Sequence, residues 1–376
     1  MSAVPGPLET RRRAMFPPFS PHGAATRDVA DLSDVRLALF SDTWAPQLNG
    51  VARTLARLTA AVRERGGAVR VVTAADPRGA PPIDSCGDAC GEDVERWPSV
   101  PFWGYPELRL AAPSVSGAAA LLGRWRPTLV HAATPFGIGL AGRQGARRLG
   151  VPFVSSYHTN LSAYAAFYGL GALSTPGWRY LRWFHGGGRR TYAPTAAVAG
   201  ELAGRGFRDV AVWGRGVDTE RFSPAARRAA LRASWGARPQ DVVALGVGRL
   251  AREKGVELAL DAVRLAGGAL ARAGAGDPQA PRLHLVLVGD GPYEGVCRAR
   301  APEGTVFAGR LEGSTLAEAY ASADLFVFPS RTDTFGNVLL EAMASGVAVV
   351  AVDAPPTREL LGDGRFGVLA PPGDAG

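Results

Sequence analysis

Cysteine is scarce in this sequence, which has only three among 376 residues: Cys86, Cys90 and Cys297. Three cysteines cannot build a disulfide framework, and a reducing cytoplasm is the simplest environment for them. Cys86 and Cys90 lie close together in a loop rich in glycine and aspartate, but further ligands for a metal ion are lacking there. The cysteines therefore predict neither a disulfide-rich secreted domain nor a zinc site.

Long apolar runs are also absent. No uncharged apolar segment reaches the ~18–20 residues that a membrane-spanning helix needs. Three arginines at positions 11–13 are followed by prolines rather than by an apolar stretch, which is not the pattern of a secretory signal. We expect residues 1–33 to be a disordered tail, or to precede the true start. The alternative is a membrane-surface role of this tail through its arginines, Met15 and Phe16.

Familiar binding motifs are missing from the glycine-rich turns of the second half, and others are missing from the whole sequence. The glycine-rich segments that begin at Gly246 and Gly289 do not match G-x-G-x-x-G, and G-x-x-x-x-G-K-[ST] does not occur. A Rossmann dehydrogenase and a P-loop ATPase are therefore disfavoured. The metal-binding pattern D-x-D is absent too.

The composition that is present is that of a folded, basic protein. Hydrophobic residues make up 47% of the chain and charged residues 20%, and 376 residues predict two domains of ordinary size. The net charge of +8 favours anionic partners such as phosphorylated ligands, nucleic acid or acidic lipid. The arginines are scattered and no motif of stacking aromatics accompanies them, so nucleic-acid binding is not expected.

Short apolar segments alternate with helical patterns along both halves of the chain. Strands are expected at residues 35–40, 69–73, 128–132, 152–156, 242–246, 283–288, 305–307, 325–328 and 347–352. Helices are expected at residues 51–65, 138–149, 256–267, 291–300, 314–321 and 336–345. This alternation predicts an α/β protein with two Rossmann-like, doubly wound domains that face each other across a cleft.

Glycine and proline cluster between the two periodic halves. We expect an N-terminal domain over residues 34–212, an interdomain linker at 213–225 and a C-terminal domain over 226–376. Residues 76–116 are rich in proline and glycine, and we expect them to be irregular.

The most informative segment is residues 328–346, where a buried strand is followed by a loop and a helix. Asp333 lies in the loop, Gly336 near the start of the helix, and Glu341 further along it. The first N–H groups of a helix have no internal partners and form an anion site. The plainer interpretation is that Asp333 caps the helix and Glu341 faces water.

A second segment weakens that plainer interpretation. Gly248, Arg249 and Lys254 follow an expected strand and open a helix. Two cations at this spacing in a glycine-flanked loop suit a diphosphate, because arginine offers a fork of donors and lysine a compact charge. The chain therefore has two candidate anion-binding segments in its second half.

These segments and three others, in this order, resemble the retaining glycosyltransferases of family 4, which have the GT-B fold. The resemblance runs from about residue 35 to residue 374. It rests on FSDTWAPQLNGV at 40–51, SYHTN at 156–160, GRGVD at 214–218, GRLAREK at 248–254 and DTFGNVLLE at 333–341. The chain most resembles the branch that contains GDP-mannose-dependent α-mannosyltransferases and glycolipid-forming glycosyltransferases.

The resemblance implies a role for each matching residue. Arg249 and Lys254 match the basic pair that holds the donor diphosphate, and His158 matches the active-site histidine beside the reacting sugar. Asp333 occupies the position of the first acid of the E-x7-E motif, usually glutamate, which contacts the donor sugar. The residues implied to bind substrate are Asn49, Gly50, Gly309, Arg310, Leu311, Phe335, Gly336, Asn337, Val338 and Glu341. Glu341 matches the second acid, which binds the donor ribose.

The resemblance also implies an activity. The expected enzyme is a metal-independent, retaining hexosyltransferase without a cofactor. It moves a hexose, with mannose favoured, from a nucleotide-sugar such as GDP-mannose or a UDP-sugar to a lipid or glycan acceptor. We expect a cytoplasmic protein, with peripheral contact to anionic membrane at the inner face as an extension of that expectation.

The end of the sequence departs from the family pattern. Family members continue with helices, the last of which crosses back to the first domain, whereas this chain stops at Gly376. The GT-B fold is therefore expected without its C-terminal crossover helices. The alternative function is a truncated relic that binds nucleotide-sugar but turns over poorly.

Overall fold

The computed structural model describes residues 31–45, 47, 49–75, 93–102, 105–158 and 174–373. Most of the expected N-terminal tail, including Met15 and Phe16, and the cysteines at 86 and 90 lie outside these residues. Leu32, at the end of that expected tail, donates its N–H to the carbonyl of Arg65 (2.8 Å) and packs against the core of the first domain.

The first half of the chain forms a parallel sheet with strand order β3-β2-β1-β6-β7-β8-β9. Its strands are β1 (Arg36–Ser41), β2 (Ala68–Ala74), β3 (Val94–Trp97), β6 (Leu129–Ala132), β7 (Phe153–Ser156), β8 (Arg190–Ala193) and β9 (Val210–Val212). The central strands are apolar and buried, as expected for strands covered by helices on both faces.

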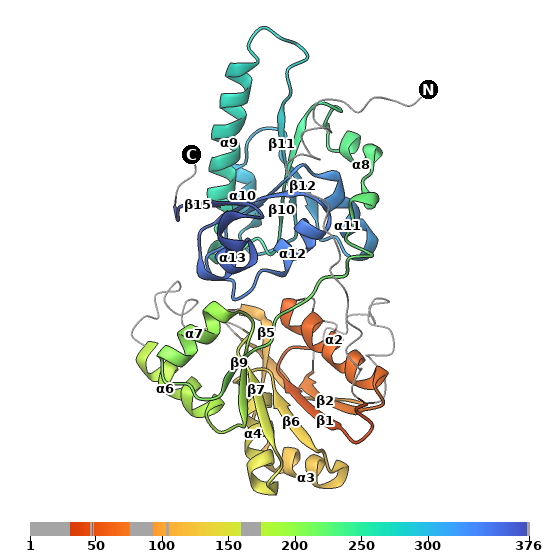
Figure 1. Cartoon of the computed structure of the whole chain (residues 1–376), viewed down its shortest axis with the longest axis vertical. Coiled ribbons are helices and arrows are strands. Elements are labelled where there is room, and N and C mark those ends of the chain that lie inside the picture. Colours follow the sequence, from red (N-terminus) through yellow and green to blue (C-terminus); the bar gives the residue numbers. More distant parts are fainter. Residues whose placement is uncertain are drawn as a thin grey trace.

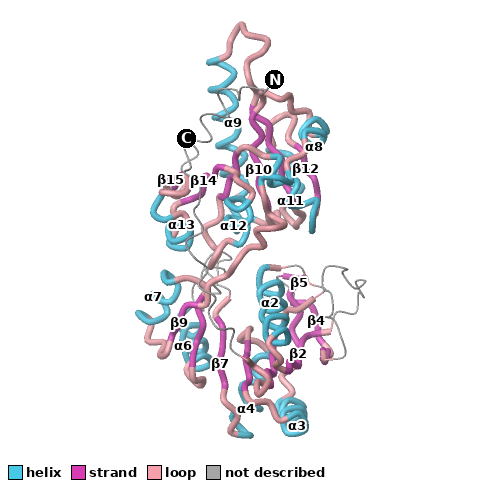
Figure 2. Tube along the Cα trace, turned by 45° about the vertical axis from the view of Figure 1, so that its right-hand side comes forward, coloured by secondary structure: helices cyan, strands magenta, loops and turns pink. Residues whose placement is uncertain are grey.

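Helices cover both faces of this sheet (Figures 1 and 2). They are α2 (Gly50–Glu64), α3 (Val115–Trp125), α4 (Gly137–Leu149), α6 (Ser174–His185) and α7 (Ala196–Gly204). Leu55 of α2 packs against Leu37 and Leu39 on one face, whereas α3 and α4 pack against Phe40 on the other. Gly142 lets α4 approach closely, because a Cβ there would lie 2.5 Å from the ring of Phe40.

The expectation of irregular structure over residues 76–116 was wrong in part. Strand β3 extends the sheet, and β4 (Ser99–Phe102) pairs with β5 (Tyr105–Ala111) in a separate antiparallel ribbon. Trp97 explains why a proline- and glycine-rich stretch forms an edge strand: its buried ring packs edge-on against Phe40 at 6.5 Å. Tertiary packing overrode the weak local propensity here.

The second half forms another parallel sheet, with strand order β12-β11-β10-β13-β14-β15. Its strands are β10 (Val242–Val247), β11 (Leu283–Val288), β12 (Val306–Gly309), β13 (Leu325–Phe328), β14 (Ala348–Val352) and β15 (Val368–Ala370). Around it lie α8 (Ala229–Ser234), α9 (Val256–Ala273), α10 (Glu294–Arg300), α11 (Gly313–Ser322), α12 (Asn337–Ala344), α13 (Pro355–Leu360) and the 3-10 turns η3 (Pro224–Ala226), η4 (Arg252–Lys254) and η5 (Gly362–Gly364). The predicted fold of two doubly wound α/β domains is confirmed.

The two domains lie one above the other, and residues 213–223 connect them (Figure 1). In each sheet the strand order reverses once, between β1 and β6 in the first and between β10 and β13 in the second. Ligands of doubly wound sheets bind at such switch points, beyond the carboxyl ends of the strands. The chain therefore has two candidate binding positions, one in each domain.

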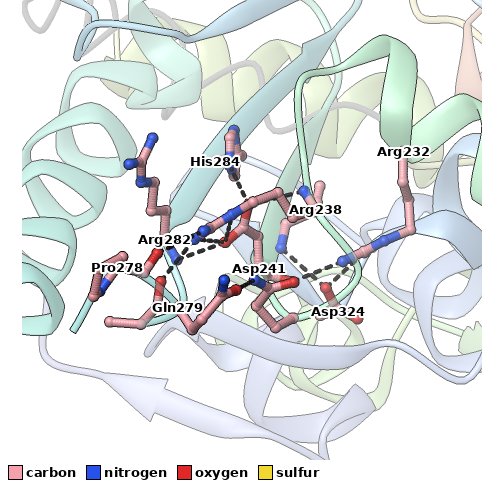
Figure 3. Close-up of polar contacts among 11 residues, drawn as sticks. Arg232, Arg238, Asp241, Pro278, Gln279, Arg282, His284 and Asp324 are labelled. Carbon is pink, nitrogen blue, oxygen red and sulfur yellow. Dashed lines mark hydrogen bonds and ion pairs between the residues drawn. The ribbon is translucent and has the colours of Figure 1, made fainter. Parts of the chain in front are cut away.

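The opposite, amino edge of the second sheet is fixed by ion pairs (Figure 3). Asp241, just before β10, accepts from Arg238 Nη2 (2.9 Å), from the N–H of Arg282 (2.9 Å) and from His284 Nε2 (3.2 Å). Asp324, just before β13, accepts from Arg232 Nη1 at 2.7 Å. Burial opposes ionisation of Asp241, but these donors outweigh it and hold its pKa well below the usual range. The charges at this edge serve the fold.

Candidate active site

The residues that the sequence nominated follow the carboxyl ends of strands in both domains. Asn49 and Gly50 come after β1, and His158 comes after β7. In the second domain Arg249 and Lys254 come after β10, residues 309–311 at the end of β12, and residues 333–341 after β13. Because these edges face each other in Figures 1 and 2, the fold brings most of these residues toward one interdomain region.

Lys254 and Asp333 form an ion pair at the switch point of the second sheet. Lys254 Nζ lies 2.8 Å from Asp333 Oδ1 and 2.9 Å from Oδ2, and both side chains are largely buried. Burial by itself would raise the pKa of Asp333, but the charge and hydrogen bonds of Lys254 outweigh it and lower that pKa. Asp333 is therefore ionised at neutral pH, and its carboxylate fixes the position of the Lys254 side chain.

Arg249 is held in a similar way by a carboxylate that the sequence did not single out. Its Nη1 lies 3.8 Å from Oε1 of Glu253, whose side chain is 1% exposed. Thr332 donates its hydroxyl to the carbonyl of Glu253 at 3.2 Å, which ties the loop after β13 to the turn after β10. The loop that contains Arg249 and Lys254 is thus linked to the loop that contains Asp333.

The start of α12 is shaped for close approach of a ligand. Gly336 precedes the helix with φ +91°, a conformation that glycine adopts without strain. Phe335 is buried beside it. The first N–H groups of an α-helix, here those of Asn337 and Val338, have no partner within the helix. This end of α12 therefore attracts negative charge, as the sequence predicted.

Gly50 of the first domain touches this helix start. A Cβ at Gly50 would lie 3.1 Å from Asn337 Nδ2 and 3.3 Å from Arg215 Nη1, so a larger residue here would require these two side chains to shift. Asn49 has a structural role: its Oδ1 accepts from the N–H groups of Val51 (3.1 Å) and Ala52 (2.9 Å) and so caps α2. The loop that contains Asn49 and Gly50 does reach the interdomain region.

Glu341 is buried at the same interface and is already engaged. Its Oε1 accepts from Arg53 Nη1 of the first domain at 3.3 Å, and its Oε2 accepts from the hydroxyl of Tyr320 at 2.9 Å. Burial raises the pKa of Glu341, which Arg53 and Tyr320 partly offset. Arg53, Asn337 and Glu341 line one small hollow between the domains. Nothing in the sequence indicated that Arg53 and Tyr320 take part in the site.

His158 joins the site through both its backbone and its ring. Its carbonyl accepts from the hydroxyl of Thr334 in the second domain at 2.7 Å. Its Nδ1 lies 3.4 Å from Arg215 Nη2, and its ring packs edge-on against Trp213 at 5.8 Å. Residues 159 and 160 of the SYHTN motif lie outside the described residues.

Arg215 is the residue that sequence reasoning missed. It lies in the GRGVD motif between the domains, and its guanidinium reaches Asn337 Oδ1 (3.3 Å), His158 Nδ1 (3.4 Å) and the ring of Phe335 (5.4 Å). Burial lowers the pKa of Arg215 to about 10, an effect that the charge of Asp333 opposes. An arginine flanked by two glycines in a connecting segment was the available signal.

Gly309, Arg310 and Leu311 stand apart from the other nominated residues. They follow β12, which lies two strands away from β10 in the sheet. Arg310 pairs with Glu312 (3.0 Å), and Leu311 packs against the core. Within the described part of the chain, no hydrogen bond or ion pair joins these three residues to Asp333 or Glu341. They share the edge of the sheet but not the cluster.

Two negative findings apply to the described residues. None of their helices is long and apolar enough to cross a membrane. Among the same residues, no group of three or more His, Cys, Asp or Glu side chains is placed to hold a metal ion.

Comparison with known proteins matches both domains to glycosyltransferase families. Residues 48–221 match the model of Glycosyltransferase Family 4, and residues 241–376 match that of Glycosyl transferases group 1. The border between the two matches falls near the segment that connects the domains.

Similar proteins cover nearly the whole chain. A GDP-mannose-dependent alpha-mannosyltransferase of Mycolicibacterium smegmatis is 38% identical over 89% of this chain and 84% of its own length. Its namesake from Mycobacterium tuberculosis is 37% identical over 90% of this chain and 85% of its own. The crystal structure of Anabaena HepE in complex with UDP-glucose superposes with a TM-score of 0.69 at 21% identity, over 90% of this chain and 86% of that one. The chain is a hexosyltransferase with the GT-B fold, and it belongs to glycosyltransferase family 4.

Proposed function

We propose that the chain transfers mannose from GDP-mannose to a lipid or glycan acceptor, with retention of the anomeric configuration. Two relatives that share 38% and 37% of their residues with it over about nine-tenths of the chain are named for GDP-mannose-dependent mannosyl transfer. A nucleotide-sugar donor also agrees with the solved relative, which was crystallised with UDP-glucose.

One structural observation carries the proposal: a fixed cationic group and a helix start lie opposite the histidine of the other domain. Lys254 is oriented by Asp333 at 2.8 Å, and Thr334, in the same loop, binds the carbonyl of His158 at 2.7 Å. A donor whose diphosphate occupies this region meets its charge partners in the second domain, with its sugar beside the first. That arrangement is the one a transferase needs.

The first half of the chemistry is departure of the nucleoside diphosphate. The bond between the anomeric carbon and the diphosphate oxygen breaks, and negative charge grows on the leaving phosphate. Arg249, Lys254 and the N–H groups at the start of α12 are the donors in place to receive that charge. Because their own partners hold them in position, little reorganisation is needed when the charge develops.

The second half is attack by the acceptor hydroxyl on the same face of the sugar. A new bond forms from the acceptor oxygen to the anomeric carbon, and the hydroxyl proton passes to the leaving phosphate oxygen. Neither step needs a covalent bond between the sugar and the enzyme. Retention follows because the acceptor enters on the side from which the diphosphate departs.

For the acceptor side, we propose a cytoplasmic enzyme that makes peripheral contact with an anionic membrane. Tyr180 and Trp183 of α6 are exposed, and the exposed Arg147 and Arg148 lie in the last turn of α4. Arg148 and Trp183 line a common hollow with Leu140 and Pro113. Tryptophan, tyrosine and arginine are the residues enriched where proteins meet membrane interfaces.

Transfer is tested with purified protein, a panel of GDP- and UDP-hexoses, and a lipid extract, with products identified by mass spectrometry. We expect GDP-mannose to bind by calorimetry and to give a mannosylated lipid. Donor binding without transfer or hydrolysis would favour the inactive relic instead. If no nucleotide-sugar binds, the proposal fails.

Membrane contact is tested separately by co-sedimentation with vesicles of neutral or mixed anionic lipid. We expect binding that rises with anionic lipid and falls when Trp183 and Arg148 are both replaced by alanine. The matched control is Arg298→Ala, which removes an exposed arginine paired with Glu294 on the second domain. Equal sedimentation with both kinds of vesicle would contradict this part of the proposal.

A further inference from the structure

The contact between Arg215 and His158 fixes the direction of one hydrogen bond. A guanidinium carries only donors and has no acceptor, so Arg215 Nη2 donates wherever it bonds. Its partner is Nδ1 of His158, at 3.4 Å. Nδ1 must therefore accept and cannot carry a proton. A neutral imidazole has one proton, which leaves it on Nε2.

His158 is also placed to stay neutral. Burial lowers the pKa of His158 well below its usual value, and the nearby charge of Arg215 lowers it further, as do His131 and His185. Protonation of Nδ1 would bring an N–H against the N–H of Arg215, which is unfavourable. The geometry and the electrostatics therefore agree on the same form of the ring.

Among the described residues, the buried Nε2–H of His158 has no hydrogen-bond partner. Nearly all buried polar groups of proteins have partners, so a buried donor without one at an active site points to a ligand. The edge-on contact with Trp213 at 5.8 Å limits rotation of the ring.

Arg215 itself is held from two other sides. Its Nη1 donates to Asn337 Oδ1 at 3.3 Å, and its guanidinium lies over the ring of Phe335, with 5.4 Å to the ring centre. Its pKa, lowered to about 10 by burial, keeps it charged at neutral pH. Both supports belong to the start of α12, so the second domain determines where Arg215 meets His158.

We infer that Arg215 is a positioning residue that holds His158 as its Nε2–H tautomer, so that this N–H donates to a hydroxyl oxygen of the hexose being transferred. The inference rests on the proposed function for the identity of the ligand, but the tautomer itself is a property of the free protein. It deepens the site by naming the group that orients its histidine.

The tautomer is tested by NMR of protein whose histidines are labelled with ¹⁵N, at pH 7 and without ligand. His158→Gln identifies the His158 signals by their loss. We expect the native protein to show a protonated Nε2 and an unprotonated Nδ1, and Arg215→Met to show a mixture of both tautomers. A proton on Nδ1 in the native protein, or an unchanged ring in Arg215→Met, overturns the inference.

A matched control is available on the same segment. Arg57 donates to the carbonyl of Gly216, next to Arg215, at 2.6 Å. Arg57→Met removes an arginine that supports this segment but does not touch His158. We expect it to leave the tautomer of His158 as in the native protein. If Arg57→Met changes the tautomer as Arg215→Met does, Arg215 acts only through the position of the segment.

The role toward the sugar is tested with donors that each lack one hydroxyl. We expect one position at which its loss lowers the native kcat by about three- to tenfold, the size of one hydrogen bond. The same loss should cost nothing further in Arg215→Met or His158→Gln. Independent, multiplicative costs would overturn the role. Because the NMR result needs no activity, an inactive native enzyme refutes the proposed function and leaves the tautomer assignment to be judged separately.

Discussion

The two switch points of this molecule share the same reversal of strand order, but they differ in what occupies the start of the neighbouring helix. In the first domain, Gly137, Gly139 and Gly142 follow β6 with the G-x-G-x-x-G spacing of a phosphate-binding turn. The anion position at the start of α4 is filled by the protein itself, since Asp42 Oδ1 accepts from the N–H of Ile138 at 3.1 Å. In the second domain, Asp333 instead forms an ion pair with Lys254, and no side chain caps the start of α12.

The difference shows that the same fold uses one switch point for structure and the other for a candidate binding site. Asp42 is 0% exposed and also accepts from the hydroxyl of Thr134 at 2.6 Å, so it joins the loops after β1 and β6 into one unit. A buried carboxyl group that accepts from the first N–H groups of a helix leaves no room there for a phosphate. A glycine-rich turn therefore indicates ligand binding only when no side chain of the protein fills it.

The largest effect on activity is expected at Lys254, at the switch point of the second domain. Lys254→Ala should lower kcat/KM by about 10²–10³-fold, the usual cost of removing one preorganised donor to a developing charge. Steady-state kinetics with the best donor of the panel measures it. The control is Arg298→Ala, an exposed arginine of α10, which should keep activity within twofold of the native value. Full activity of Lys254→Ala would remove the contrast between the two switch points.

The second effect is a pH dependence of the unfolding free energy that arises from Asp42 in the first domain. Burial raises the pKa of Asp42 to about 6. The protonated carboxyl is therefore favoured in the folded state, and the stability that it contributes below pH ~4 is lost as the pH rises through about 6. Relative to Asp42→Asn, the native protein should lose about 2 kcal/mol of unfolding free energy between pH 4 and pH 7, since each pKa unit corresponds to about 1.4 kcal/mol and most of the shift falls in this interval.

Urea unfolding of both proteins at several pH values measures this difference. Asp241→Asn is the matched control with the opposite sign, because the donors around Asp241 hold its pKa low. Its contribution is present above the unfolded pKa of about 4 and is lost only as the pH falls toward the folded value. The Asp241→Asn difference should therefore be flat from pH 4 to pH 7. A flat difference for Asp42→Asn as well would contradict our interpretation of the first switch point.

A smaller effect is expected at Glu341, which lies at the interdomain hollow but is partly satisfied by the protein. Glu341→Gln keeps the shape and weakens the contacts with Arg53 and Tyr320. We expect KM for the donor to rise about tenfold with kcat changed less, because the affected hydrogen bonds involve a charged group. Arg53→Ala tests the partner from the other domain. If Glu341→Gln lowers kcat and leaves KM unchanged, Glu341 acts on the transition state rather than on donor binding.

The smallest effect on stability is expected at the start of α7, which adds a third helix start to the comparison. The first N–H groups of α7, those of Ala196 and Ala197, donate to the carboxylate of Glu359 in the second domain, both at 2.9 Å. This helix start is thus filled by the other domain. Glu359→Gln should cost less than about 1 kcal/mol, as for other helix caps, and lower the melting temperature by about 2 °C. A decrease above 5 °C would mean that this contact holds the domains together far more strongly than a cap.

Much of the fold was predictable because its strands are short, apolar and regularly spaced between helical patterns. The expected strand at residues 283–288 coincides with β11, and that at 325–328 with β13. Strand β3 and the ribbon of β4 and β5 were missed, because their local sequence is rich in glycine and proline. Their order comes from pairing and from the packing of Trp97, which no local pattern contains.

The site was predictable where a residue type and its place after a strand carry the chemistry. Lys254, Asp333 and the start of α12 are of this kind, and the structure brings them together. Arg53 and Tyr320 were not predictable, since they reach Glu341 from separate elements. The structural role of Asp42 was not predictable either, because its partners Thr134 and Ile138 lie more than 90 residues away in the chain.

The sequence by itself determined the alternation of strands and helices, the family, and the positions of the cations and glycines after the strands. Those features are local or follow the chain order, so they can be recognised without coordinates. Only the tertiary structure decided which helix start is filled, because Asp42 and Ile138 are far apart in the chain and meet through the sheet. It also determined which ring nitrogen of His158 carries the proton, because the donor to Nδ1 is Arg215, which lies far from His158 in the chain.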